Sequence, residues 1–88
     1  MLASSEVTVV LPAGVDLHAR PAAAFVKAAM GFSSRVEVSS GERSADAKSL
    51  LAILALGARR GTELRLRADG DDAAEALDGL ATVVASLE

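Results

Sequence analysis

Alternation between apolar and charged side chains is most regular in the segment 62–68, where Leu64, Leu66 and Ala68 occupy every second position. Successive side chains of a β-strand point to opposite faces of its sheet, so one face of this strand must be buried while the other meets water. Antiparallel sheets with one covered face show this pattern. The sequence therefore predicts a strand here, in a sheet whose helices lie on one side.

Shorter patterns predict the elements that precede this strand. An alternating segment at 7–11, closed by Pro12, predicts a first strand that leads into a loop. An apolar stripe at helical spacing runs from Ala22 to Met30 and predicts a helix that ends at Gly31. Alternation at 35–38 then predicts a hairpin, with its turn at 39–41 and a short polar strand at 42–45.

Two more helices complete the predicted pattern. Asp46 is expected to cap a short helix that includes Lys48 and Ser49 and ends at Gly57. The acidic run at 69–72 ends the strand before it and should supply acids to the first turn of a last helix. The apolar stripe of that helix comprises Leu77, Leu80, Ala81 and Val84.

The predicted order is β-α-β-β-α-β-α, which indicates an α+β fold. We expect an open-faced β-sandwich with a four-stranded, mainly antiparallel sheet and three helices on one face. Two interleaved βαβ halves would satisfy the right-handed crossover rule and bring the beginning of the chain near its middle. With 88 residues and no linker-like segment, we expect a single domain over residues 1–88.

Composition excludes several kinds of function. Nine basic against twelve acidic residues give a net charge of -3, which offers no basis for nucleic-acid binding. With no cysteine and one histidine, neither a cysteine zinc site nor a multi-histidine metal site fits within the chain, and we expect no metal or cofactor. The start lacks a signal-peptide pattern and no stretch approaches the roughly 20 apolar residues of a membrane span, so we expect a cytoplasmic protein without membrane insertion.

The only histidine, His18, stands beside Arg20 and Pro21 immediately before the first predicted helix. Proline is tolerated in the first turn of a helix, so His18 should lie at or just before the helix N-terminus. Free backbone N–H groups and the positive end of the helix dipole favour anions there, and the Arg20 guanidinium would add to them. A neutral imidazole is nucleophilic near neutral pH, so these residue types suit a phosphoryl group carried on His18.

Two separate motifs carry a family resemblance. They are Leu17-His18-Ala19-Arg20-Pro21-Ala22-Ala23, and Ala47-Lys48-Ser49-Leu50-Leu51 followed by Leu56-Gly57. With Gly61 and Gly70 at their spacing, these motifs resemble the histidine-containing phosphocarriers (HPr) of the bacterial sugar phosphotransferase system over nearly the whole chain. The resemblance implies that His18 accepts a phosphoryl group from phosphorylated enzyme I and passes it to IIA domains of sugar transporters, with Arg20 as its electrostatic partner. It implies a phosphocarrier that is not an independent enzyme.

The resemblance also assigns a docking role to the second predicted helix. This helix is apolar almost all round, which is more than one buried stripe needs. By resemblance, Leu50, Leu51 and Leu54 would face enzyme I and the IIA domains. The two other large apolar residues, Ile53 and Leu56, would enter the core. The alternative is that all five are core residues.

Ser49 matches a serine that HPr kinase/phosphorylase modifies in several bacterial groups, which implies regulatory phosphorylation. A phosphate there would be tolerated by a helix N-terminus and would add charge to the surface. The alternative is a serine that is simply favoured near a helix start. The resemblance is to a carrier that meets its partners one at a time, and we expect a monomer.

Two positions depart from the usual family pattern. Asp16 stands two residues before His18 where glycine is typical, and Asp46 stands where asparagine is common. A carboxylate close to His18 would raise the pKa of the imidazole and repel an arriving phosphoryl group. We therefore expect Asp16 to point away from the imidazole, and titration of His18 in Asp16→Gly tests this expectation.

Two other function classes stay open. A phosphocarrier of a different cascade, serving nitrogen signalling or dihydroxyacetone phosphorylation, would keep His18 and change only the partners. A ligand-binding regulatory βαββαβ module would bind a small molecule and carry no acid-labile phosphate. A small enzyme of the acylphosphatase kind would need a glycine-rich phosphate loop with an arginine, which the sequence lacks.

Overall fold

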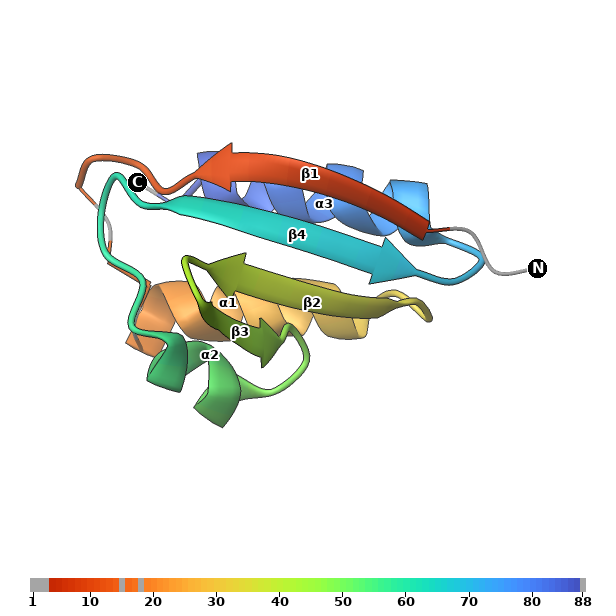
Figure 1. Cartoon of the computed structure of the whole chain (residues 1–88), viewed down its shortest axis with the longest axis horizontal. Coiled ribbons are helices and arrows are strands. Elements are labelled where there is room, and N and C mark those ends of the chain that lie inside the picture. Colours follow the sequence, from red (N-terminus) through yellow and green to blue (C-terminus); the bar gives the residue numbers. More distant parts are fainter. Residues whose placement is uncertain (1–3, 15, 18, 88) are drawn as a thin grey trace.

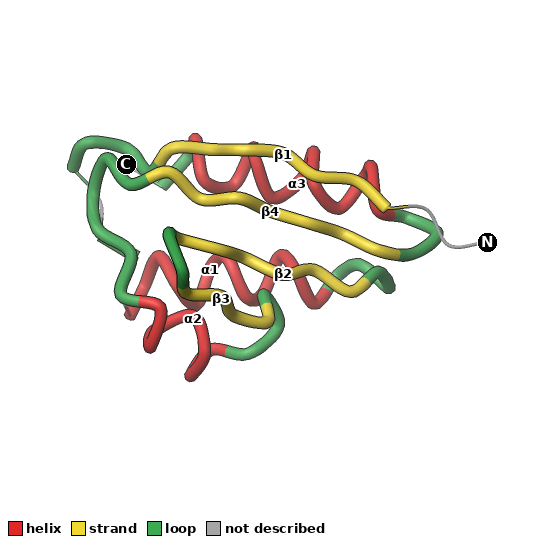
Figure 2. Tube along the Cα trace, viewed as in Figure 1, coloured by secondary structure: helices red, strands yellow, loops and turns green. Residues whose placement is uncertain are grey.

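The computed structural model describes residues 4–14, 16–17 and 19–87, and its elements follow the predicted order β-α-β-β-α-β-α (Figure 1). The predicted α+β fold class is confirmed, and Figure 2 shows the strands gathered in one sheet with the helices beside it. The strands are β1 (Ser4–Val10), β2 (Arg35–Ser40), β3 (Arg43–Asp46) and β4 (Glu63–Asp69), and the helices are α1 (Ala19–Met30), α2 (Leu50–Leu56) and α3 (Ala73–Ala85).

The four strands form one sheet in the order β1-β4-β2-β3, and each neighbouring pair is antiparallel. The beginning of the chain lies one strand away from its middle, with β4 between β1 and β2. The alternating apolar residues of β4 are all buried on one face of the sheet. In this inner strand, Leu66 pairs with Val7 on one side and with Val38 on the other.

The helices cover one face of this sheet. In Figure 1, α1 and α3 lie behind the strands, while α2 lies at the margin beside β3 and packs against α1. The core between the layers is aliphatic, as predicted, with Phe25 as its one fully buried aromatic side chain in the described residues. Strand β4 and helix α1 therefore meet across a core of small and branched side chains.

Two details of the predicted pattern differ in the structure. Met30 was expected on the buried stripe of α1 but is 66 % exposed. Periodicity identifies the buried face of a helix without telling how far the neighbouring layer extends along it, and Met30 is the last residue of α1. The hairpin turn consists of Gly41 and Glu42, one residue later than predicted, because Ser40 still pairs with Arg43.

The prediction that Asp46 caps the second helix is also wrong. Asp46 is the last residue of β3, and its Oδ1 accepts a hydrogen bond of 2.9 Å from the backbone N–H of Lys48. An aspartate often holds a turn in this way, two residues before the donor. Helix α2 begins only after that turn and is capped by Ser49.

Candidate functional site

The loop between β1 and α1 is held against the loop between α2 and β4. The Leu11 N–H donates to the Thr62 carbonyl at 3.0 Å, and the Gly61 N–H donates to the Leu11 carbonyl at 3.0 Å. Further along, the Leu17 N–H donates to the Ala58 carbonyl at 2.9 Å. The side chains of Leu11 and Leu17 are both buried, so each end of this loop is fixed by a backbone contact and by the core.

Asp16 adds a side-chain contact to the same pair of loops. Its Oδ1 accepts a hydrogen bond of 2.7 Å from the backbone N–H of Arg60 and lies 3.6 Å from Nε of the same residue. The carboxylate is therefore joined to both the backbone and the guanidinium of Arg60. The expectation that Asp16 points away from the imidazole stays a prediction, since His18 lies outside the described residues.

Helix α1 begins at Ala19, the residue that follows His18 in the sequence. The prediction of a helix that starts beside the His18 motif is thus confirmed, with Pro21 in the first turn. Arg20 is exposed, and the first turn of α1 contains no acidic residue. The first amides of a helix have no acceptor within the helix, so this terminus favours an anion.

The exposed large apolar residues of α2 are the ones that the resemblance assigned to docking. Leu51 is 80 % exposed, and Leu50 and Leu54 are also exposed, whereas Ile53 and Leu56 are buried in the core. The alternative that all five are core residues is therefore wrong. The chain runs from the end of α2 directly into the loop that contacts Leu17 and Asp16, so the C-terminal end of α2 is linked to the loop that leads to His18.

Ser49 is the N-cap of α2. Its Oγ accepts a hydrogen bond of 3.2 Å from the backbone N–H of Ala52, and the residue is half-buried. At the other end of α2, Gly57 adopts φ 67° and its N–H donates to the Leu54 carbonyl at 3.2 Å, as the sequence predicted. The structure thus confirms that Ser49 lies at the helix start, where the structural role and the regulatory role are compatible.

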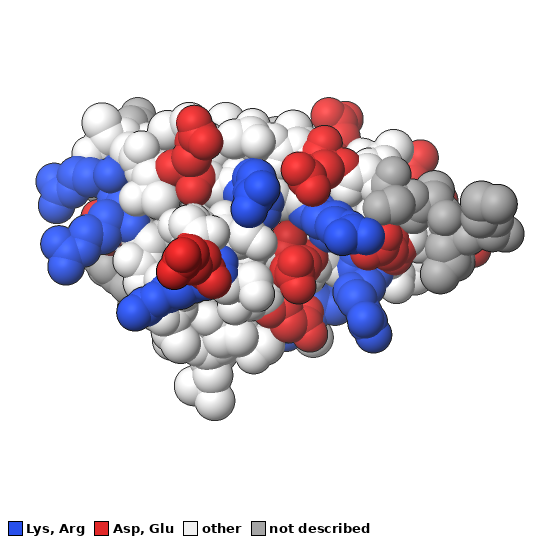
Figure 3. Space-filling view, viewed as in Figure 1, with Lys and Arg blue, Asp and Glu red and all other residues white. Residues whose placement is uncertain are grey.

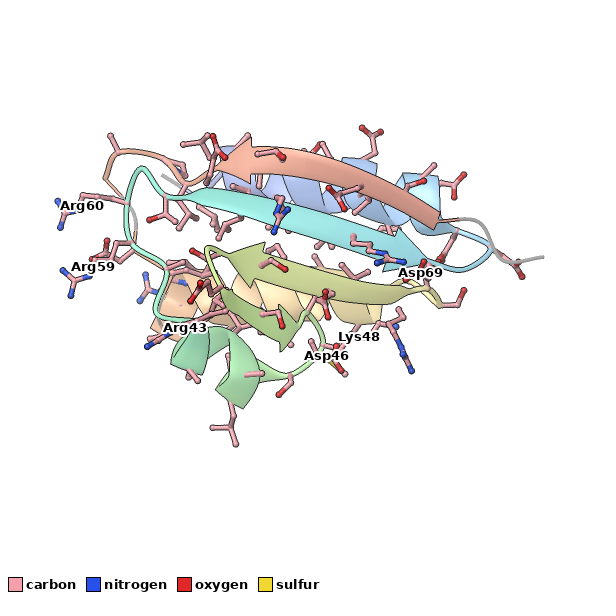
Figure 4. All side chains as sticks on the ribbon, viewed as in Figure 1. Arg43, Asp46, Lys48, Arg59, Arg60 and Asp69 are labelled. Atoms are coloured by element: carbon pink, nitrogen blue, oxygen red, sulfur yellow. The ribbon has the colours of Figure 1, made fainter. Side chains whose placement is uncertain are left out.

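Sequence reasoning missed two features of this region. Nζ of Lys48 donates to the Phe32 carbonyl at 2.7 Å, which joins the turn before α2 to the segment after α1. Arg59 and Arg60, which were not among the predicted site residues, project from the end of the molecule that carries the loop 11–17 (Figure 4). In Figure 3, basic side chains gather at that end, whereas basic and acidic side chains are interspersed over the sheet face. The adjacent pair of arginines after the cap at Gly57 was the available signal.

The described residues hold neither a metal-binding group of side chains nor a membrane-spanning helix. Among them, no group of three or more His, Cys, Asp or Glu side chains is arranged to hold a metal ion. None of the helices in that part of the chain is both long enough and apolar enough to cross a membrane.

Comparison with known proteins identifies the family. The family described as "PTS HPr component phosphorylation site" matches residues 3–86. The phosphocarrier protein HPr of Haemophilus influenzae is 47 % identical over 72 residues, which are 82 % of this chain and 85 % of that protein. The crystal structure of HPr-C-His from Thermoanaerobacter tengcongensis superposes with a TM-score of 0.89 at 40 % identity, covering 93 % of this chain and 92 % of that one. The crystal structure of an HPr dimer from the same organism gives a TM-score of 0.75 at 43 % identity, covering 80 % of each chain. The chain therefore belongs to the HPr family of phosphocarriers of the phosphotransferase system.

Proposed function

We propose that this chain relays a phosphoryl group from phosphorylated enzyme I to IIA domains through a transient phosphohistidine at His18. The observation that carries the proposal is the start of α1 immediately after His18, with Arg20 exposed in its first turn and no acid among the turn's residues. A helix N-terminus and a guanidinium both stabilise the negative charge of a phosphoryl group bound beside them. The chain acts as a carrier within a transfer between two other proteins, and it is not an independent enzyme.

The chemistry of the relay follows from the residue types. One nitrogen of the neutral imidazole attacks phosphorus as the bond from phosphorus to the donor breaks, so an N–P bond replaces the bond in phosphorylated enzyme I. Arg20 would hold the phosphoryl oxygens during in-line transfer, where positioning and electrostatics supply most of the catalysis. The same bond then breaks when the IIA domain takes the group, which restores the free imidazole.

Partner docking would use the exposed face formed by Leu50, Leu51 and Leu54. A face this apolar, beside the loop that leads to His18, suits partners that must bring their own reactive group to the same place. We propose that enzyme I and the IIA domains dock there in turn. We propose that the chain forms a single domain over residues 1–88 and carries out the relay as a monomer. One similar HPr crystallised as a dimer.

We propose that Ser49 is a regulatory site for HPr kinase/phosphorylase. The support is its position as N-cap of α2, next to the exposed leucines. A phosphate ester would keep an acceptor near the Ala52 N–H while adding negative charge to the docking face. Incubation with the kinase and ATP should give an acid-stable phosphate that Ser49→Ala lacks, and no such product with an active kinase would contradict the regulatory role.

The central test is phosphorylation with enzyme I, magnesium and phosphoenolpyruvate, followed by intact-mass measurement before and after mild acid. The wild-type chain should gain one phosphoryl group that acid removes, and His18→Ala should gain none. Arg20→Ala should accept the group about tenfold more slowly or worse, because a preorganised partner for the developing charge is lost. An equally acid-labile phosphate on His18→Ala would overturn the assignment.

A further inference from the structure

Asp16, the residue before Leu17, makes a specific contact in the structure. Asp16 reaches the loop after α2 through its side chain, while Leu17 reaches the same loop through its backbone. Two consecutive residues are thus fixed to Arg60 and Ala58, and His18 is the next residue in the sequence. Any displacement of this pair would be passed directly to His18.

We infer that Asp16 is a positioning residue, which clamps the loop before His18 onto the backbone of Arg60 and so sets the placement of the acceptor histidine. The inference rests on the proposed role of His18. Phosphoryl transfer depends on the alignment of the attacking atom, and misplacement by about 1 Å can cost roughly a hundredfold in rate. A fixed connection two residues away is therefore able to act on the rate of transfer without touching the phosphoryl group.

The backbone contact is the stronger half of the clamp. The Arg60 N–H lies 2.7 Å from the carboxylate oxygen, which is the length of a hydrogen bond to a charged acceptor. The ion pair with Nε is longer, at 3.6 Å, and the Arg60 side chain is 65 % exposed, so water screens it. Replacing the arginine side chain would leave the main contact in place, whereas shortening Asp16 would remove it.

The clamp also removes an electrostatic objection to a carboxylate in this loop. A lone negative charge near the acceptor would repel an incoming phosphoryl group. Here the carboxylate faces the guanidinium of Arg60, and Arg59 projects from the same end of the molecule (Figure 4). The guanidinium of Arg60 thus offsets part of the charge of Asp16.

Three variants separate these contributions. Asp16→Ala removes the acceptor of the Arg60 N–H, Asp16→Asn keeps an acceptor oxygen without the charge, and Arg60→Met keeps the backbone N–H without the guanidinium. The measurement is rapid-quench transfer from phosphorylated enzyme I, which gives the maximal rate constant and the half-saturation concentration. Hydrogen exchange of the Arg60, Leu17 and Leu66 amides reports the clamp, the loop and the core of the same samples.

The expected pattern is specific. Asp16→Ala should lower the maximal rate constant about tenfold and leave the half-saturation concentration within about twofold, because alignment is lost while docking is kept. The Arg60 and Leu17 amides should exchange faster in this variant, and the Leu66 amide should not. Asp16→Asn should restore most of the rate, and Arg60→Met should cost about threefold at most, because each keeps the backbone hydrogen bond.

Each contrary result has one meaning. A wild-type maximal rate in Asp16→Ala would overturn the positioning role, and so would an Asp16→Asn variant as slow as Asp16→Ala. Faster exchange at Leu66 would show that the loss is general unfolding and would also overturn it. If the wild-type chain itself took up no acid-labile phosphate, the proposed function would fail first, whereas failure of the clamp alone leaves phosphorylation of His18 intact.

Discussion

The carboxylate of Asp72 joins the start of α3 to the segment after α1. It accepts hydrogen bonds of 2.9 Å from the backbone N–H groups of Ser33 and Ser34, and another from the Ser34 hydroxyl. These donors favour the charged form, with the Ser34 hydroxyl first among them, and lower the pKa of Asp72 from 3.8 to about 2. An aspartate expected to serve its own helix thus serves a loop 38 residues away in the chain.

The lowered pKa predicts how Asp72→Asn will behave across pH. The folded state holds the Asp72 proton less tightly than the unfolded state, so the stabilisation is fully present above pH 3.8 and is lost as the pH falls toward about 2. Asp72→Asn should therefore unfold at lower urea concentration than wild type between about pH 5 and 7, and the two should converge as the pH falls from about 4 toward about 2. A difference in unfolding free energy that stays constant down to pH 2 would contradict this assignment.

Gly70 lies against Ser34, one of the residues that bind Asp72, and this position requires glycine. Its φ of 148° is a conformation that other residues rarely adopt, and an added Cβ would lie 2.8 Å from Cα of Ser34. Gly70→Ala should lower the free energy of unfolding by about 2 kcal/mol or more, since strain and a backbone clash combine. Gly14→Ala is the matched control, because a Cβ at Gly14 meets no atom within 4 Å. Equal urea midpoints for the two variants would refute the argument.

Individual side chains were predictable where their role is local. Ser49 and Gly57 bound α2 through contacts within the helix, and the sequence located the end at Gly57 but placed the start three residues too early, at Asp46. Asp46 and Asp72 were expected to serve helix starts, yet they bind a turn and a distant loop. All four positions carry residues common at helix ends, so only the tertiary neighbours decide which aspartate acts as a cap.

Helix α2 has one exposed face and one buried face, and a pair of substitutions distinguishes the role of each face. Leu51→Glu alters a side chain that is 80 % exposed, so it should change the free energy of unfolding by no more than about 0.5 kcal/mol. The same substitution should raise the half-saturation concentration for phosphorylated enzyme I. Ile53→Ala empties a fully buried site in the same helix and should lower the free energy of unfolding by about 2–5 kcal/mol. Unfolding is followed by circular dichroism, and docking by transfer kinetics below the unfolding temperature.

The contrary outcomes are equally distinct for this helix. Unchanged half-saturation in Leu51→Glu would remove Leu51 from the docking face, and strong destabilisation would assign it to the core. From its sequence alone the helix is apolar almost all round, which fits a role in the core and a role in docking equally well. Its division into two faces came from the resemblance and required the structure, since only packing against α1 and β3 decides which leucines are covered.

Strand β4 connects the beginning of the chain to its middle, because it pairs with β1 on one side and with β2 on the other. Alternation predicted each of these strands and the layer of helices. It did not predict their order, because an apolar face satisfies the core equally well beside several neighbours. The site depends on that order: the loops after β1 and before β4 meet, and there Leu17 and Asp16 are held.

This arrangement predicts that the chain unfolds as one unit, with β4 at its centre. Leu66 is fully buried and pairs with Val7 and Val38, so Leu66→Ala should lower the free energy of unfolding by about 2–5 kcal/mol. Arg65→Ala, on the exposed face of the same strand, should change it by about 0.5 kcal/mol or less. Calorimetry should show one transition for each variant, with calorimetric and van't Hoff enthalpies equal. Two separate transitions would contradict a single domain, because the halves of the chain on either side of β4 would then be unfolding independently.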